Sequence, residues 1–217
     1  MPNWCSNILD VTGSPQALAR FAEAVSIPAS DQANLPRDTR PVPLSFERIL
    51  PTPPELCLPG ADGWYKWRVN NWGTKWDLDG DTYYTVFPVE GGLERRRYVF
   101  DTAWSPALGI YQQMAHDYLD LIFEAFWAET GNCFAGRSTF VDGREIEFIE
   151  AGEPDHCIRL AQRAGFPEIA DSFQPYEEEE EETEPEDPAP TESGDPVAAS
   201  DPGLVETPKA LAAEDLP

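Results

Sequence analysis

The sequence predicts an α+β chain with a ferredoxin-like split βαβ sandwich, in which two helices cover one face of an antiparallel sheet. Two strand-like segments are each followed by a Ser-Pro pair and an amphipathic helical pattern, at Ser14-Pro15 and at Ser105-Pro106. A hairpin pattern lies between these two units, with its turn at Gly91-Gly92. We therefore expect the order strand, helix, strand, strand, helix, strand, followed by a further hairpin.

The first strand–helix unit is predicted from an alternating, β-branched segment over residues 4–11, which Gly13 ends. Ser14 suits the N-cap of a helix, and Pro15 suits its first position, where no N–H is needed. The expected apolar face of this helix has members three or four residues apart: Leu18, Phe21, Ala22 and Val25. Pro28 ends the helix.

A tryptophan-rich insertion is predicted over about residues 44–77. The preceding segment, 28–43, is polar and proline-rich, as is typical of a loop, and 44–50 has the pattern of a short extended piece. Four of the seven tryptophans then fall within residues 63–77. The spacing of Trp64, Trp67 and Arg68 favours a short helix in this stretch, with Gly73 at its end.

The middle hairpin is predicted from two β-rich segments, 83–87 and 97–101, on either side of Gly91-Gly92. A turn at Gly80-Asp81 precedes it. After Ser105-Pro106, the second helix is expected to bury one apolar stripe: Leu108, Tyr111, Met114, Ala115 and Tyr118.

The last predicted hairpin extends the sheet. A strand over 119–128 pairs with a strand over 133–141, and Asp142-Gly143 is a two-residue turn into a strand over 144–150. The first of these strands has four apolar side chains on one face: Leu121, Phe123, Ala125 and Trp127. A short helix over 154–164 follows.

These elements divide the chain into a ferredoxin-like domain over 1–152, a short helical segment over 153–175 and a disordered acidic tail over 176–217. The formal net charge is −25, and the tail contributes −14 of it, with 15 acidic residues and one lysine. Residues 1–175 therefore carry −11. The tail cannot bury enough apolar surface to offset its ordering entropy.

The tail has three interpretations: a solubilising end, an autoinhibitory segment paired with the basic run Arg95 to Arg97, or a mimic of the DNA phosphate track. A disordered run of glutamates lacks the fixed spacing of a duplex, which places mimicry below a simple tail. Because the whole chain is acidic, it repels nucleic-acid phosphates over long range, and a nucleic-acid partner is disfavoured.

The four cysteines form no Cys-x-x-Cys pair, so no zinc or thioredoxin-type motif is predicted. The N-terminal residues lack the basic and apolar regions of a secretory signal, and no stretch approaches the roughly 18 to 20 apolar residues of a spanning helix. We expect a cytoplasmic protein with reduced thiols, no membrane partner, no metal and no cofactor. The oligomeric state stays open.

Several long motifs resemble the YubB-like ferredoxin-like family of plasmid and phage proteins. The motifs are Met1-Pro-Asn-Trp-Cys-Ser-Asn7, Phe46-Glu47 with Ile49 and Pro51, Trp67-Arg68, Asn71-Trp-Gly-Thr-Lys-Trp-Asp77 and Phe100-Asp-Thr-Ala-Trp-Ser-Pro106. The resemblance covers about residues 1–141. It implies a ferredoxin-like domain carried by mobile elements, and it implies no established activity and no catalytic residue.

A candidate ligand or partner site combines three of these motifs, at the start of the first strand, in the insertion and before the second helix. Antiparallel neighbours bring such strand ends together. The candidate residues are Trp4, Arg68, Asn71, Trp72, Lys75, Trp76, Asp77, Asp101 and Trp104. An aromatic floor with a charged rim suits a nucleobase, a sugar or a cationic group. The competing interpretation is a core that these tryptophans close, with Lys and Arg stems over the rings and Asp on the indole N–H groups.

The leading functional hypothesis is an uncharacterised accessory protein of a phage or plasmid, acting as a non-enzymatic binding module. Its Trp/Lys/Asp surface would engage a host or phage protein, or a small ligand. The alternatives are a single-stranded nucleic-acid binding protein, an acidic DNA mimic or anti-defence protein, and an enzyme with Lys75 and Asp101 as an acid/base pair. The sequence has no Ser/His/Asp pattern, phosphate-binding glycine loop or zinc-protease helix to name a reaction.

Overall fold

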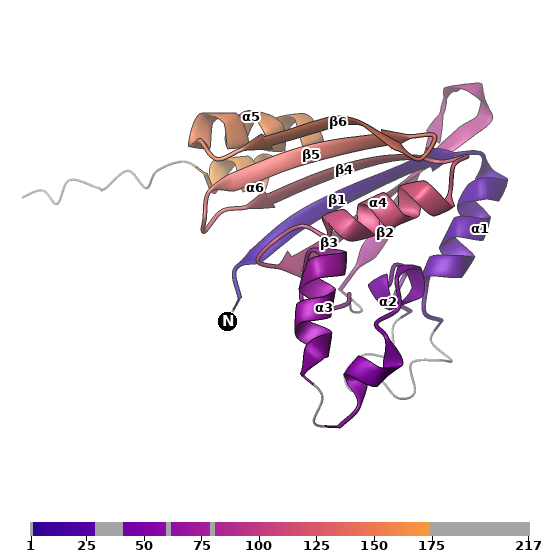
Figure 1. The fold of residues 1–217 in the computed structure, drawn as a ribbon. Helices are drawn as coiled ribbons and strands as arrows, with labels where there is room; N and C mark the ends of the chain where they lie inside the picture. The colour runs from indigo at the N-terminus through magenta and orange to yellow at the C-terminus, as the bar shows by residue number, and fades with distance from the viewer. Residues whose placement is uncertain (1, 29–40, 60–61, 79–80, 174–217) are drawn as a thin grey trace, which may run out of the picture. The chain divides into compact units, whose positions relative to one another are not determined.

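The computed structural model describes residues 2–28, 41–59, 62–78 and 81–173 (Figure 1). The strands are β1 (Trp4–Gly13), β2 (Tyr83–Val89), β3 (Leu93–Ala103), β4 (Ile122–Glu129), β5 (Phe134–Val141) and β6 (Arg144–Ala151). The helices are α1 (Pro15–Val25), α2 (Phe46–Ile49), α3 (Gly63–Trp72), α4 (Leu108–Asp117), α5 (Pro154–Ala164) and α6 (Pro167–Asp171), with the 3₁₀ helices η2 (Pro54–Cys57) and η3 (Glu90–Gly92).

Six strands of the described residues form one antiparallel sheet in the order β2-β3-β1-β4-β5-β6. Because β3 lies between β1 and β2, and α1 and α4 follow β1 and β3, the first four strands have the ferredoxin-like arrangement. The hairpin β5-β6 extends the sheet beyond β4. The predicted fold class is therefore confirmed.

The central strand β1 pairs with β3 along its whole length, from Trp4 opposite Ala103 to Gly13 opposite Glu94. Side chains alternate across a strand. One face of β1 therefore contributes to the core under α1 and α4, and the other presents Trp4, Ser6, Ile8 and Asp10. Both of the surfaces described below use this second face.

The first core lies between the sheet and the helices α1 and α4. Helix α1 begins as predicted, with the Ser14 hydroxyl accepting a hydrogen bond from the Ala17 N–H at 3.2 Å. Phe21 of α1 is fully buried and contacts three aromatic rings edge-on: Tyr98, Tyr118 and Phe123. Burial of each such side chain contributes about 1.5–3 kcal/mol.

A buried polar network fixes α4 to the central strands. Asn7 on β1 is fully buried, and its amide donates to Thr102 Oγ1 on β3 at 2.9 Å and to the Cys5 carbonyl at 2.7 Å. The Tyr111 hydroxyl of α4 donates to Asn7 Oδ1 at 2.7 Å. Burial raises the pKa of Tyr111 well above its ordinary value, which keeps this donor protonated. The network sets the position of α4 against β1.

A second core covers the opposite face of the sheet, over β4 and β5, and consists mainly of α5 and α6 packed on Ile8, Phe126 and Ala135 (Figure 1). The sequence pattern predicts a helix over 154–164, and α5 has these bounds. It does not predict the second layer. Because α5 covers only part of this face, the β3 and β1 end of the sheet stays accessible.

The expected extended piece over 44–50 is wrong, because this segment contains helix α2. Ser45 is its N-cap, and the buried Phe46 begins the helix. Asp77 accepts hydrogen bonds from the Phe46 N–H at 2.6 Å and from the Ser45 hydroxyl at 2.7 Å. A carboxylate about 30 residues away in the sequence thus accepts hydrogen bonds from the free N–H groups at the start of this helix.

The expected helix start at Ser105-Pro106 is also wrong. Helix α4 begins at Leu108 after Ala107, and the Ser105 hydroxyl donates to the Gly73 carbonyl at 2.6 Å instead. The Ser105 carbonyl accepts from the Thr102 hydroxyl at 2.8 Å. Ser105 therefore joins the end of α3 to the end of β3 rather than starting a helix.

Three expectations fall wholly or partly outside the described residues: the loop over 28–43, the turn at Gly80-Asp81 and the disordered tail over 176–217. In the described part of the chain, no helix has the length and apolar character needed to cross a membrane. The same residues contain no group of three or more His, Cys, Asp or Glu side chains placed to hold a metal ion.

Candidate functional site

Three tryptophans lie in contact at one end of the sheet, and we call them the indole row: Trp4, Trp76 and Trp104. The ring centroids of Trp4 and Trp76 are 6.1 Å apart, and those of Trp76 and Trp104 are 5.9 Å apart. Their exposed fractions are 52%, 37% and 42%. The three indoles come from β1, from the segment after α3 and from the segment after β3, and together they form one aromatic surface.

The segment that carries Trp76 is fixed on both sides of the ring. Gly73 ends α3 in the left-handed region at φ 92°, and a Cβ there would be 2.6 Å from the Pro106 carbonyl oxygen. The Thr74 hydroxyl donates to the Ala103 carbonyl at 3.0 Å, and Asp77 is bonded to the start of α2. With its neighbours held in this way, Trp76 is left exposed.

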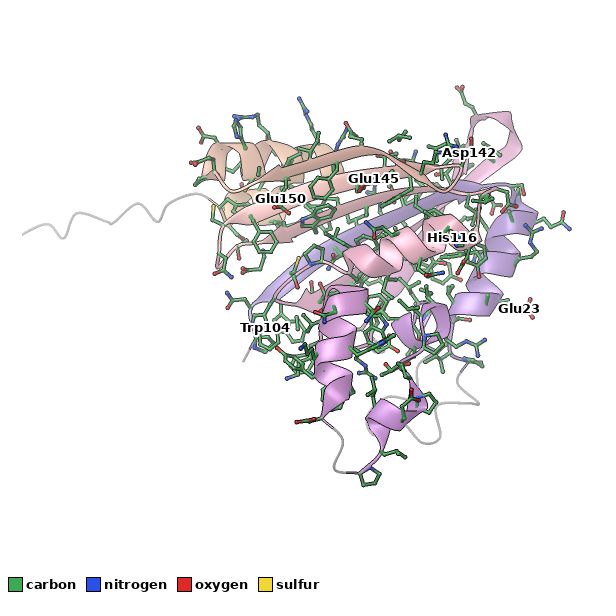
Figure 2. The ribbon with its side chains drawn as sticks, viewed as in Figure 1. Glu23, Trp104, His116, Asp142, Glu145 and Glu150 are labelled. Carbon is green, nitrogen blue, oxygen red and sulfur yellow. The ribbon has the colours of Figure 1, made fainter. Side chains whose placement is uncertain are left out.

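Trp104 adopts a conformation that is rare for a bulky residue. Its φ is 65°, in the left-handed region, which costs about 1–3 kcal/mol for such a side chain. Its N–H donates to the Asn3 carbonyl at 2.9 Å, which continues the pairing of β1 and β3 beyond Ala103. Figure 2 shows Trp104 beside the start of β1, at the end of the sheet near α3. The strained backbone presents this indole to solvent next to Trp76.

Lys75 lies over the aromatic surface. Its Nζ is 4.6 Å from the ring centroid of Trp76, 5.6 Å from that of Trp104 and 5.3 Å from that of Tyr65. Such contacts contribute about 0.5–1 kcal/mol each at exposed positions. The ammonium group therefore bridges the rings of Trp76 and Trp104, and Lys75 is partly exposed.

A groove of about 1000 Å³ borders the indole row. Its lining residues are Trp4, Arg68, Trp76, Asp77, Leu78, Asp81, Thr82, Tyr83, Val99, Phe100, Asp101 and Ala103. Three carboxylates and one guanidinium line it, so its formal charge is negative. Asp101 is exposed on β3, and its Oδ1 accepts a hydrogen bond from the Ser6 hydroxyl at 2.8 Å. Aromatic rings and carboxylates thus face the same space.

Four of the expected site residues have their bonds within α3 or between α3 and the α2 region. Trp72 is fully buried, and its indole N–H donates to the Leu50 carbonyl at 2.8 Å. Arg68 lies over the rings of Trp64 and Trp72, and it pairs with Glu47. Asn71 donates to the Trp67 carbonyl at 2.8 Å. The core interpretation therefore describes Trp72, and only Arg68 and Asp77 of this group reach the groove.

Asp77 lines the groove, but both of its carboxylate oxygens are already engaged in hydrogen bonds. Burial raises its pKa, and its hydrogen bonds with Ser45 and with the N–H groups of Phe46, Leu78 and Glu47 oppose that rise. Cys5, next to Trp4 in the sequence, faces the first core, and burial raises the pKa of its thiol to about 12. The thiol stays protonated at neutral pH, so Cys5 is a packing residue.

Lys75 and Asp101 are not brought together as an acid/base pair. No ion pair joins these two described residues, and Lys75 is not among those that line the groove. The Lys75 ammonium faces aromatic rings, whereas Asp101 bonds Ser6. This geometry gives the enzymatic hypothesis no support.

The structure adds Tyr83 and Val99 to the site, two residues that the sequence did not single out. Tyr83 on β2 lies opposite Val99 on β3, and both line the groove. The alternation of Tyr83-Tyr-Thr-Val-Phe87 places Tyr83 on one face of the sheet, but only the pairing of β2 with β3 shows that this is the face of Asp101.

No curated protein matches the chain. The chain is similar to the crystal structure of the protein api92 from Yersinia pseudotuberculosis, at 11% sequence identity, over 70% of this chain and 99% of that one, with a TM-score of 0.49. Residues 72–186, more than half of the chain, match the family model described as the ferredoxin-like domain in Api92-like protein. The match spans β2 to α6 and leaves β1 and α1 outside it. The chain belongs to this family of Api92-like proteins.

Proposed function

We propose that this protein is a non-enzymatic binding module whose groove and indole row hold a cationic, extended segment of a partner protein. We place it in the cytoplasm, as an accessory protein of a phage or plasmid. The motif resemblance to YubB-like proteins supports the mobile-element setting, and the free cysteines of the described residues suit a reducing compartment.

The observation that carries the proposal is the indole row beside a groove lined with carboxylates. Tryptophan and tyrosine are the residues most enriched in the centres of protein interfaces, because each covers a large area at a low entropy cost. Three half-exposed indoles in mutual contact offer such a centre. Two of them, Trp4 and Trp76, also line the groove with Tyr83.

The charge of the groove favours a cationic ligand. Asp101 lies on β3 opposite Ser6, and its second oxygen, Oδ2, has no hydrogen-bond partner among the described residues. A lysine or arginine of a partner would bond this oxygen and stack on Trp4 or Trp76. The net charge of −11 over residues 1–175 attracts such a segment over long range.

A single-stranded nucleic acid is the second candidate, and Lys75 is the observation that favours it. A cation over two exposed indoles resembles the combination on which bases stack while a phosphate is neutralised. The negative groove opposes this ligand, because the phosphate backbone would pass Asp101. Which ligand binds distinguishes the two candidates more clearly than the salt dependence of binding does.

Indole N–H signals in a two-dimensional NMR titration of the full chain test the proposal. The probes are an arginine-rich peptide with one aromatic residue and a thymidine oligonucleotide, each at low salt. We expect the peptide to shift the signals of Trp4, Trp76 and Trp104, and to leave the buried Trp72 and Trp127 unchanged. Shifts by the oligonucleotide alone would select the second candidate, and no shift by either probe would contradict both.

A Trp76→Ala variant completes the test, with Phe148→Ala as its matched control. Both positions hold exposed aromatic side chains, and Phe148 lies on β6, at the far edge of the sheet from β3. Peptide binding is expected to weaken at least about tenfold in Trp76→Ala, as for an interface hot spot, and to stay unchanged in Phe148→Ala.

A further inference from the structure

A second hollow, of about 180 Å³, lies on the same face of the sheet, between the strands and α5. Four arginines line it from three elements: Arg95 and Arg97 on β3, Arg137 on β5 and Arg163 on α5. The acidic side chains in its lining are Asp10 and Glu124. Its volume is far above the ~10–15 Å³ that holds one water molecule. We call it the arginine pocket.

The arginine pocket has an excess of positive charge. Four guanidinium groups face two carboxylates, in a part of the chain that carries −11. Arg137 has its own partner outside the lining, Glu147. Arg163 forms no ion pair within the described residues. This concentration of cations is therefore opposite in sign to the rest of residues 1–175.

Asp10 orients the Arg97 guanidinium at the pocket but leaves one of its nitrogens without a hydrogen bond. Its two oxygens accept from Arg97 Nε at 2.8 Å and Arg97 Nη2 at 2.7 Å, and the nearest Arg95 nitrogen is 3.7 Å away. Asp10 is itself buried, so it fixes the plane of the Arg97 guanidinium. The remaining nitrogen, Arg97 Nη1, has no hydrogen-bond partner among the described residues.

One further donor of the pocket, on Arg137, is not satisfied by the protein. Arg137 Nε is buried and has no hydrogen-bond partner in the described structure. Leaving a buried N–H without an acceptor costs free energy, and an acceptor bound in the pocket would recover it. At the end of α5, Gly165 has no side chain near Arg97 Nη1: a Cβ there would be 3.6 Å from this nitrogen. No side chain at position 165 therefore covers Nη1.

We propose that the arginine pocket binds the phosphate group of a small phosphorylated ligand. A guanidinium group can donate two parallel hydrogen bonds to two oxygens of one phosphate. Because Asp10 already fixes the plane of the Arg97 guanidinium, this group is oriented before the ligand binds. Arg95 and Arg163, which are more loosely held, close on the remaining oxygens. This site is separate from the groove, because none of its lining residues lines the groove.

The test is a titration of the full chain with inorganic phosphate, followed by the Nε–H NMR signals of the arginines and by calorimetry. We expect saturable binding at one site, with the Arg97 and Arg137 signals shifting together, and no equivalent change with chloride at equal ionic strength. Absence of saturable phosphate binding would overturn the proposal.

Two double variants with the same change in net charge distinguish phosphate binding in the pocket from a general electrostatic attraction of phosphate. Arg95→Gln with Arg163→Gln removes two lining groups. Arg96→Gln with Arg159→Gln removes neighbours that do not line the pocket. Phosphate affinity is expected to fall about tenfold or more in the first pair and to change less than about twofold in the second. Equal losses in both pairs, in variants whose melting temperatures show that they are folded, would overturn the proposal.

Discussion

Glycine at position 73 determines whether the indole row can form. Its left-handed φ and the 2.6 Å approach of the Pro106 carbonyl to a built Cβ both oppose any side chain. Gly91 also has a left-handed φ, 77°, but a Cβ there would meet nothing within 4 Å. Substitution at Gly91 therefore tests backbone strain alone, and substitution at Gly73 tests strain together with a steric clash.

We expect Gly73→Ala to lower the free energy of unfolding by about 2–4 kcal/mol, because backbone strain adds to the clash. Gly91→Ala carries the strain alone and is expected to cost about 1 kcal/mol. Urea unfolding of both variants measures the difference. Equal losses would show that the end of α3 can move away from Pro106, against the description of the site.

At the residue scale, the local pattern indicates that the tryptophans matter, but it does not show which of them are buried and which are exposed. Trp72 and Trp76 lie four residues apart in one motif, yet one is buried under Leu50 and Phe46 and the other is exposed. The residues that decide this, Leu50 and Pro106, are distant in the chain. No spacing within 63–77 contains that information, so the list of site residues was partly a list of core residues.

At the scale of elements, the position of α4 depends on one buried hydroxyl. Tyr111 donates to Asn7 Oδ1, and Asn7 in turn bonds Thr102. Loss of the hydroxyl leaves a buried acceptor without its donor. Tyr118, at the end of the same helix, is only partly buried, and its hydroxyl has no hydrogen-bond partner among the described residues, which makes it a matched comparison.

Tyr111→Phe is therefore expected to destabilise the fold by about 1–3 kcal/mol, and Tyr118→Phe by less than about 0.5 kcal/mol. Chemical denaturation followed by circular dichroism measures both. If the two variants lose the same stability, the Asn7 network does not fix α4.

Helices and strands with strong local signals were predictable, and those with distant partners were not. Ser14-Pro15 and Ser105-Pro106 have the same pattern, but only Ser14 has a free helix N–H within reach. Helix α2 is four residues long and needs Asp77 to complete its first turn. A single sequence shows neither contact, because both depend on how α3 packs against the strands.

At the scale of the whole molecule, the chain is a sheet with a core on each face, and α5 and α6 are needed for the second. A chain that ends at Gly152 would expose Ile8, Phe126 and Ala128. We expect it to melt at a lower temperature than the full chain and to bind a hydrophobic dye. A chain that ends at Phe173 keeps both helices and is expected to melt like the full chain. Equal melting of the two truncated chains would contradict a stabilising role for α5.

The face of the sheet that α5 partly covers contributes to both proposed surfaces. The groove with Asp101 lies toward the start of β1, and the arginine pocket lies toward its middle and under α5. The two surfaces share no lining residue, so a cationic peptide and a phosphate are expected to bind at separate sites. The fold accounts for this arrangement, because α5 covers β4 and β5 and leaves part of β1 and β3 accessible.

The most direct test of the central claim is the affinity of an arginine-rich peptide for Asp101→Asn and for Asp142→Asn. Each variant removes one negative charge, and Asp142 lies in the β5-β6 turn, at the opposite end of the sheet from Trp104 (Figure 2). Asparagine tolerates the left-handed φ of 51° at position 142. The account predicts at least about tenfold weaker binding for Asp101→Asn and a change below about twofold for Asp142→Asn. Equal affinities of the two variants would contradict it.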